Sequence, residues 1–145
     1  MKIPRMTVIT LGVSDLARST AFYREIFSTQ PITENEGVTF FPLPGVWLSL
    51  YPLEKLAEDI GKDIKLSKPG TFGGFTLAYN ARSKEDVSHI FVRAGVVGAH
   101  IAKAPQDTFW GGYSGYFSDP DGHYWEVAWG PMFDFSEHGD LRFKA

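Results

Sequence analysis

The sequence predicts an α+β domain in which a β-α-β-β-β unit occurs twice and forms a curved, mostly antiparallel sheet with a concave pocket. Three observations predict this fold class. Segments rich in β-branched and aromatic residues alternate with two helical patterns, both halves repeat the same order, and a polar stretch separates them. The single domain would span residues 1–145, with repeat units at about 5–52 and 72–130 and a linker at about 53–71.

The first half opens with a predicted strand and helix. Residues Thr7–Val13 are rich in β-branched side chains, which favour a strand. The pair Ser14-Asp15 that follows consists of residue types that cap helix N-termini. Apolar residues at helical spacing then predict a helix over Leu16–Phe27. Two further strands are expected, at 37–42 and 46–51.

The second half repeats this order after a short helix predicted at Leu53–Ile60 and the polar linker. A strand is expected at Gly74–Asn80, and Ser83 followed by Asp86 resembles the capping box that begins a helix. That helix would end at Gly95. Strands are also expected at 100–104, 112–118 and 123–129, with the turn Asp119-Pro120-Asp121-Gly122 between the last two.

Composition excludes several classes of function. A net charge of −3 argues against a nucleic-acid partner, which would need a basic surface. The absence of cysteine excludes disulfides, thiolate nucleophiles and zinc–thiolate sites. No apolar run approaches the roughly 18 residues that span a membrane, and no signal-peptide core follows Met1. We therefore expect a cytoplasmic protein that binds neither nucleic acid nor membrane.

Two blocks of sequence carry a family pattern, Leu11–Phe27 (LGVSDLARSTAFYREIF) and Gly111–Trp129 (GGYSGYFSDPDGHYWEVAW). They resemble the start and the finish of the vicinal oxygen chelate superfamily, which includes glyoxalase I, extradiol dioxygenases, and fosfomycin- and bleomycin-resistance proteins. The first block is similar to the pattern V-x-D-L…FY, and the second to the closing hairpin F-x-D-P-D-G…E. The resemblance covers nearly the whole chain and implies the glyoxalase/bleomycin-resistance/dioxygenase fold and a homodimer.

Metal-dependent members of that superfamily hold a divalent cation at four strand positions, two in each unit. Holding a cation takes several oxygen or imidazole ligands. Of the four positions that the resemblance implies here, only Glu126 keeps a usual ligand. We therefore expect neither a metal nor another cofactor. The other three positions fall on Val8, Ser49 and Phe75, and a register shift of two residues offers Thr10 or Leu77.

Aromatic residues provide the strongest positive indication, since ten of them lie within residues 109–135. Such rings build cores, but they also line ligand pockets and interfaces. Because side chains alternate along a strand, Tyr124 should lie on the same face as Glu126. His123 and Trp125 should lie on the opposite face. One set is expected to line the cavity. The candidate ligand-binding residues are Thr10, Ser49, Phe75, Trp110, Tyr113, Tyr116 and Tyr124.

These patterns lead to two hypotheses of function. The first is a metal-independent protein, similar to the bleomycin-resistance type, that binds a small, partly aromatic molecule. The alternative is a metal-dependent glyoxalase-like lyase, isomerase or dioxygenase that uses Glu126. Glu126 is the candidate catalytic residue, as a general base or hydrogen-bond acceptor, or else a carboxylate paired with a nearby Tyr, Ser or Arg. The sequence leaves open whether the chain is an enzyme, and whether residues 132–145 cover the pocket.

Overall fold

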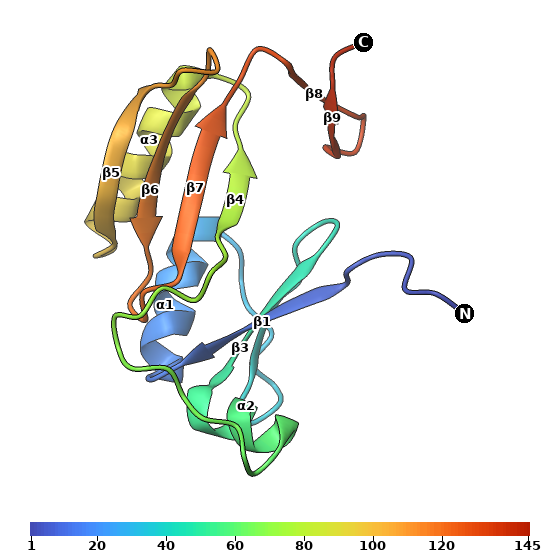
Figure 1. Cartoon of the computed structure of the whole chain (residues 1–145), viewed down its shortest axis with the longest axis vertical. Helices are drawn as coiled ribbons and strands as arrows, with labels where there is room; N and C mark the ends of the chain where they lie inside the picture. Colours follow the sequence, from blue (N-terminus) through green and yellow to red (C-terminus); the bar gives the residue numbers. More distant parts are fainter. The chain divides into compact units, whose positions relative to one another are not determined.

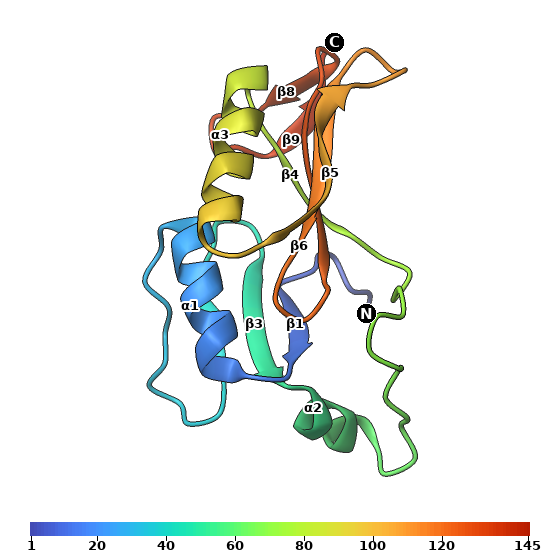
Figure 2. The same cartoon turned by 90° about the vertical axis from the view of Figure 1, so that its left-hand side faces the viewer.

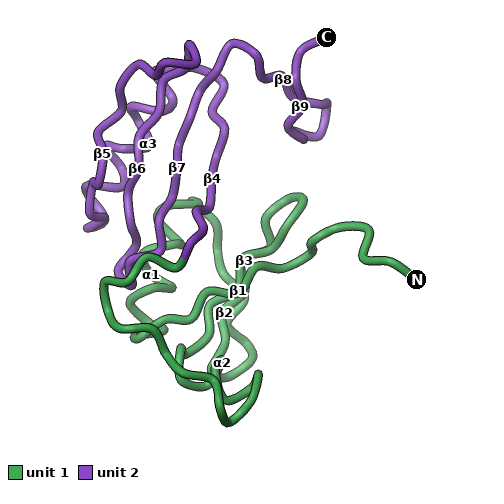
Figure 3. Tube along the Cα trace, in the orientation of Figure 1, with its two compact units in different colours: residues 1–73 green, residues 74–145 purple.

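The computed structural model describes residues 1–145 and contains three α-helices and nine β-strands. The chain divides into two compact units, residues 1–73 and residues 74–145 (Figure 1 and Figure 3). Each unit combines a mixed sheet with helices, so the predicted α+β class is confirmed. No helix has both the length and the apolar character that crossing a membrane requires.

Unit 1 consists of β1 (Val8–Val13), α1 (Leu16–Phe27), β2 (Thr39–Phe41), β3 (Trp47–Pro52) and α2 (Leu53–Ile60). Its central strand is β3, which pairs in parallel with β1 and antiparallel with β2. The fourth strand that a β-α-β-β-β unit requires is reduced to a single bridge between Ile32 and Phe40. The strands and helices predicted for this half are therefore present.

Helix α1 has the bounds that the sequence predicted. Its N-cap is Asp15, whose carboxylate accepts a hydrogen bond from the backbone N–H of Arg18 at 3.0 Å. The helix buries Phe22 and Tyr23. The ring of Tyr23 lies 6.3 Å from that of Phe41 on β2, centre to centre. Aromatic packing thus joins the helix to the sheet of unit 1.

Unit 2 consists of β4 (Leu77–Asn80), α3 (Lys84–Val96), β5 (His100–Asp107), β6 (Tyr113–Ser118), β7 (Tyr124–Trp129), β8 (Phe133–Phe135) and β9 (Leu141–Phe143). Four of these strands form one sheet in the order β4-β7-β6-β5. The pair β4–β7 is parallel and the other two pairs are antiparallel. Strands β8 and β9 form a separate two-stranded sheet.

Helix α3 covers one face of the four-stranded sheet (Figure 2). Its N-cap is Ser83, whose hydroxyl oxygen accepts a hydrogen bond from the N–H of Asp86 at 3.1 Å, as predicted. The ring of Phe91 meets Phe117 edge-on at 5.8 Å, and Phe117 in turn stacks on Trp125 at 6.3 Å. Phe117 is 1% exposed, so these rings form the core of unit 2.

The predicted turn between β6 and β7 is organised by Asp119, whose side chain is buried. Its Oδ1 accepts hydrogen bonds from the backbone N–H groups of Asp121 and His123, both at 2.9 Å. Gly122 has a φ of 85°, a conformation that glycine adopts without strain. These contacts fix the register in which β7 pairs with β6.

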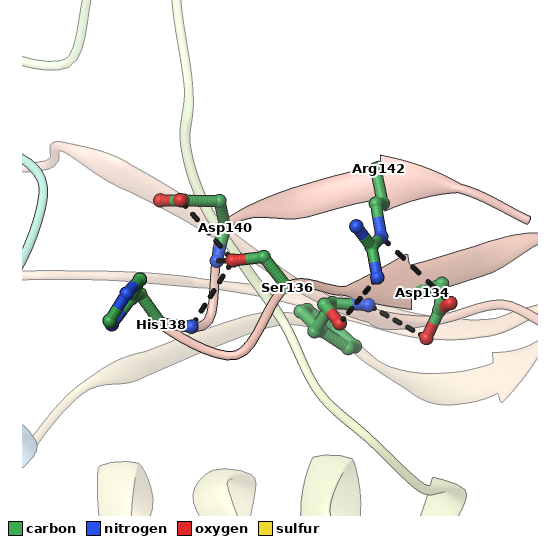
Figure 4. Close-up of polar contacts among 6 residues, drawn as sticks. Asp134, Ser136, His138, Asp140 and Arg142 are labelled. Carbon is green, nitrogen blue, oxygen red and sulfur yellow. Dashed lines mark hydrogen bonds and ion pairs between the residues drawn. The ribbon is translucent and has the colours of Figure 1, made fainter.

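The C-terminal segment, whose fate the sequence left open, forms the hairpin of β8 and β9. The rings of Phe133 and Phe143 stack across it with their centres 5.5 Å apart. Its turn is closed by Ser136, whose hydroxyl oxygen accepts hydrogen bonds from the N–H groups of His138 and Asp140 (Figure 4). The C-terminal segment thus forms a hairpin that the sequence did not predict.

Candidate functional site

The four-stranded sheet of unit 2 has two chemically different faces. On β6, Tyr113 and Phe117 point toward α3, because the Tyr113 hydroxyl lies 3.2 Å from Oγ of Ser88 and Phe117 contacts Phe91. Alternation then directs the intervening residues to the opposite side, here called the helix-free face. Strand pairing places these residues on it: Ala78, Ser114, Tyr116, Ser118, Tyr124, Glu126 and Ala128.

Tyr116 and Glu126 form the central polar contact of the helix-free face. They are direct partners on β6 and β7, and the Tyr116 hydroxyl donates a hydrogen bond to Oε2 of Glu126 at 3.2 Å. Both side chains are half-buried. Ala78 is the partner of Glu126 on β4, so an exposed methyl group lies beside it. The neighbours of this contact on the same face thus include small side chains, Ala78 on β4 and both Ser114 and Ser118 on β6.

The environment of Tyr116 affects the pKa of its phenol. Burial raises the pKa of the Tyr116 phenol above its ordinary value, and both the charge of Glu126 and the hydrogen bond to it raise that pKa further. The phenol therefore remains a protonated donor at neutral pH, facing a carboxylate acceptor. Of the partners expected for Glu126, the structure thus selects a tyrosine.

The other predicted aromatic residues of unit 2 do not all share this face. Tyr124 does, since it is the partner of Ser118 across β6 and β7. Tyr113 lies on the side of α3, with Lys84 5.6 Å from its ring centre, so it shares no surface with Tyr116.

Two further predicted residues lie outside the strands of the sheet. The ring of Trp110 packs where side chains at Gly112 and Gly130 would otherwise stand, which indicates a structural role in the β6–β7 region. Phe75 precedes β4 and its ring lies 6.3 Å from that of His123. Strand pairing places Ala78, and not Phe75, beside Glu126. The sequence did not reveal Ala78 because it does not give the register of β4 against β7.

In unit 1 the structure brings Thr10 and Ser49 together. They are direct partners on β1 and β3, and Phe40 is the partner of Ser49 on β2. The ring of Phe40 lies 6.0 Å from that of Trp47 on the same side of the sheet. Ser49 is buried, whereas Thr10 is exposed. This face therefore presents hydroxyl groups and aromatic rings.

The residues at the implied metal positions do not fit a divalent cation. Val8 pairs with Trp47, and Ser49 offers only a hydroxyl group. Strands β1, β2 and β3 contain no histidine, aspartate or glutamate at all. Nowhere in the chain do three such side chains gather closely enough to hold a metal ion. A single carboxylate, Glu126, does not compete with water for a cation.

Comparison with known proteins places this geometry in a family context. A family model described as the Glyoxalase/Bleomycin resistance protein/Dioxygenase superfamily matches residues 5–127. The chain is 29% identical to a metallothiol transferase FosB of Bacillus licheniformis over 133 residues, which cover 92% of this chain and 80% of that protein. It is 32% identical to the metallothiol transferase FosB of Staphylococcus epidermidis, with 87% of this chain and 84% of that protein covered.

Solved structures share the fold over most of the chain. A glyoxalase-related enzyme from Fulvimarina pelagi has a TM-score of 0.85 and 31% identity, covering 99% of this chain and 100% of that chain. A lactoylglutathione lyase from Agrobacterium tumefaciens has a TM-score of 0.68 and 22% identity, covering 93% of this chain and 100% of that one. At that identity the second likeness concerns the fold alone.

Proposed function

Because the chain belongs to the Glyoxalase/Bleomycin resistance protein/Dioxygenase superfamily, we propose that it binds a small, partly aromatic molecule on the helix-free face without a metal. The observation that carries this proposal is the contact between the Tyr116 hydroxyl and the Glu126 carboxylate. A protonated phenol and a carboxylate side by side form a donor and an acceptor on one surface. They suit recognition of a ligand by hydrogen bonding and stacking.

The chemistry of the helix-free face limits the ligand. Glu126 uses Oε2 for Tyr116, so Oε1 is available to accept a hydrogen bond from an N–H or O–H group of the ligand. The rings of Tyr116 and Tyr124 provide aromatic surface beside Glu126, since Tyr116 is its direct partner on β6 and Tyr124 lies two residues from it on β7. The ligand is therefore an aromatic compound that is neutral or cationic and carries a hydrogen-bond donor.

The metal-dependent alternative has one specific argument in its favour. The curated relatives at 29–32% identity are named metallothiol transferases, and that name implies a metal in those proteins. In this chain the residues at Val8, Ser49 and Phe75 do not supply ligands, as described above. The alternative thus requires Glu126 to act with groups that the implied positions lack, and it is the less favoured of the two.

Thermal unfolding distinguishes the two proposals, since a ligand that binds only the folded state raises the unfolding midpoint. Protein prepared without chelators or a metal-affinity tag is titrated with indole or benzamidine, and separately with Mn²⁺, Ni²⁺ or Zn²⁺. We expect the aromatic compounds to raise the midpoint and the metals to leave it unchanged. A metal bound at about one equivalent, and lost in Glu126→Gln, would instead support the alternative.

Matched variants then locate the binding site. Glu126→Gln and Tyr116→Phe should each reduce the shift caused by benzamidine, because one removes the acceptor charge and the other the phenol. Glu85→Gln removes the same charge from an exposed position on α3 and serves as the control. Equal shifts in Glu126→Gln and in the control would contradict the proposed site.

A homodimer is the second part of the proposal, and it rests on the resemblance to the superfamily. Light scattering combined with gel filtration measures it directly. A mass of twice that of the chain at micromolar concentration is the expected result, and a monomer at that concentration would exclude it.

A further inference from the structure

A pocket lies in unit 2, where the C-terminal hairpin meets the chain just after β7 and just before α3. Its volume is about 270 Å³, slightly below the range of roughly 300–1,000 Å³ typical of pockets for drug-sized ligands. None of the residues that sequence analysis proposed as ligand contacts lines it. The lining residues that matter here are Arg82, Trp129, Phe133, Asp134, Phe135 and Lys144.

The pocket carries uncompensated positive charge. Asp134 is its one acidic lining residue, and its two oxygens are already engaged: Oδ1 accepts a hydrogen bond from the N–H of Phe135 at 2.9 Å, and Oδ2 lies 3.9 Å from Nε of Arg142 (Figure 4). Arg82 and Lys144 take part in no ion pair. Two cations therefore face the pocket without a counter-charge, in a chain whose net charge is −3.

Arg82 is oriented by an aromatic ring. Its guanidinium carbon lies over the Phe135 ring, 4.3 Å from the centroid, in a cation–π contact. No hydrogen bond or ion pair within the protein engages the N–H donors at the edge of this planar group. That edge matches two oxygens of a carboxylate or phosphate group, which arginine binds in a bidentate manner.

The remaining walls are apolar. Phe133 and Phe135 come from β8, and Phe133 is itself held by its stacking on Phe143. Trp129 lines the pocket from the end of β7 and is half-buried. Rings next to a pair of cations favour a ligand with an anionic head and an apolar or aromatic body.

We propose that this pocket binds a small organic anion, with its carboxylate or phosphate group between Arg82 and Lys144 and its apolar body against Trp129 and Phe133. The site is independent of the helix-free face, and its ligand has the opposite charge preference. The anion site can therefore be absent while the proposed function stands, and the proposed function can fail while the anion site is present.

Binding is measured on the full chain by calorimetry, and located by the backbone amide shifts of ¹⁵N-labelled protein. The probes are benzoate, phenyl phosphate, inorganic phosphate and, as a neutral analogue, benzyl alcohol. We expect benzoate or phenyl phosphate to bind at least about tenfold more tightly than benzyl alcohol, since each ionic contact adds a charge-assisted hydrogen bond. The amides that shift should be those of Gly130, Phe135 and Lys144.

The two anionic probes distinguish the sources of the ligand. Tighter binding of benzoate identifies a carboxylate ligand, and tighter binding of phenyl phosphate identifies a phosphate ester. Binding of inorganic phosphate as tight as that of phenyl phosphate would contradict the proposed contact with the apolar walls.

Variants assign the contacts. Arg82→Gln should weaken binding of the better probe by about tenfold or more, and Arg82→Lys should weaken it less because the charge remains. Lys144→Gln, which leaves the contact with Phe135 intact, tests the site even where Arg82→Gln alters the hairpin. Arg93→Gln removes a charge from an exposed position on α3 that does not line the pocket, and it should bind normally.

The proposal fails under three results. These are equal affinity for benzoate, phenyl phosphate and benzyl alcohol, unchanged affinity in the Arg82→Gln/Lys144→Gln double variant, or amide shifts confined to the strands around Glu126.

Discussion

The phenol of Tyr116 and the carboxylate of Glu126 lie in direct register on antiparallel strands, joined by a hydrogen bond of 3.2 Å. Each side chain therefore forms part of the environment of the other. Burial raises the pKa of the phenol, the charge of Glu126 and the hydrogen bond raise it further, and the phenol donates to one oxygen of the carboxylate. This mutual dependence gives the first prediction.

Glu126→Gln should lower the pKa of Tyr116 toward its ordinary value of about 10, while burial, the largest cause of the shift, keeps it from falling completely. A raised pKa in the folded state stabilises the fold below the unfolded-state pKa, and this stabilisation is lost as pH rises through the folded-state pKa. In the variant that loss should be smaller and should be complete at lower pH, because the folded-state pKa lies closer to that of the unfolded chain.

The measurement is the phenolate absorbance followed through alkaline pH, with the Tyr116→Phe titration subtracted to isolate this group. Glu85→Gln should reproduce the parent curve. A Tyr116 titration that does not move in Glu126→Gln would show that the carboxylate charge has no influence on the phenol.

Gly115→Ala should destabilise the protein. A Cβ atom there would lie 2.6 Å from the carbonyl oxygen of Lys103 and 2.7 Å from Cζ of Phe91, so β6 or the core ring must shift. Such overpacking costs about 1–3 kcal/mol. Gly95→Ala, on α3 with no atom near the new methyl group, should instead stabilise by roughly 0.5–1 kcal/mol. Urea unfolding of the two variants would give opposite signs, and equal signs would contradict the packing described here.

Asp119→Ala should loosen the turn between β6 and β7. The substitution leaves the backbone N–H groups of Asp121 and His123 without their acceptor, and each unsatisfied group costs about 1–3 kcal/mol when buried. Asp119→Asn keeps an oxygen in the same place and should lose less. Chemical denaturation measures both, and comparable losses would indicate that the charge matters more than the hydrogen bonds.

Asp15→Ala should reduce the free energy of unfolding by about 0.5–2 kcal/mol, since it removes the acceptor for the N–H of Arg18 at the start of α1. Asp15→Ser restores a capping oxygen and should recover most of that loss. Thermal unfolding of the pair tests the prediction, which is wrong if Ser and Ala at this position behave alike.

The helices could be predicted because their signals are local. Asp15 and Ser83 cap α1 and α3 through contacts three residues away, and the apolar residues of each helix recur at helical spacing. The turn at Asp119 is equally local. Such features depend on neighbours in sequence, so composition and order suffice to find them.

The members of the site were harder to predict because strand register connects residues far apart in the chain. Alternation applied within β6 would already have separated Tyr113 from Tyr116, which are three residues apart and so lie on opposite faces. No rule of spacing, however, shows that Ala78 lies beside Glu126, since that depends on how β4 pairs with β7.

The C-terminal hairpin escaped prediction for a different reason. Each of its strands has only three residues, so alternation is too short to distinguish it from a polar tail. Its stability comes from the stacking of Phe133 on Phe143 and from the turn around Ser136, contacts that appear only when the segment folds back. The pocket beside Arg82 was invisible for the same reason.

The burial of Ser49 limits which side chains can replace it. A histidine introduced there alone would place an imidazole in a site that is 3% exposed, where an unpaired polar group is costly. A divalent cation would not bind to this imidazole and offset that cost, because it needs several ligands. Ser49→His alone should therefore destabilise the fold without creating a metal site.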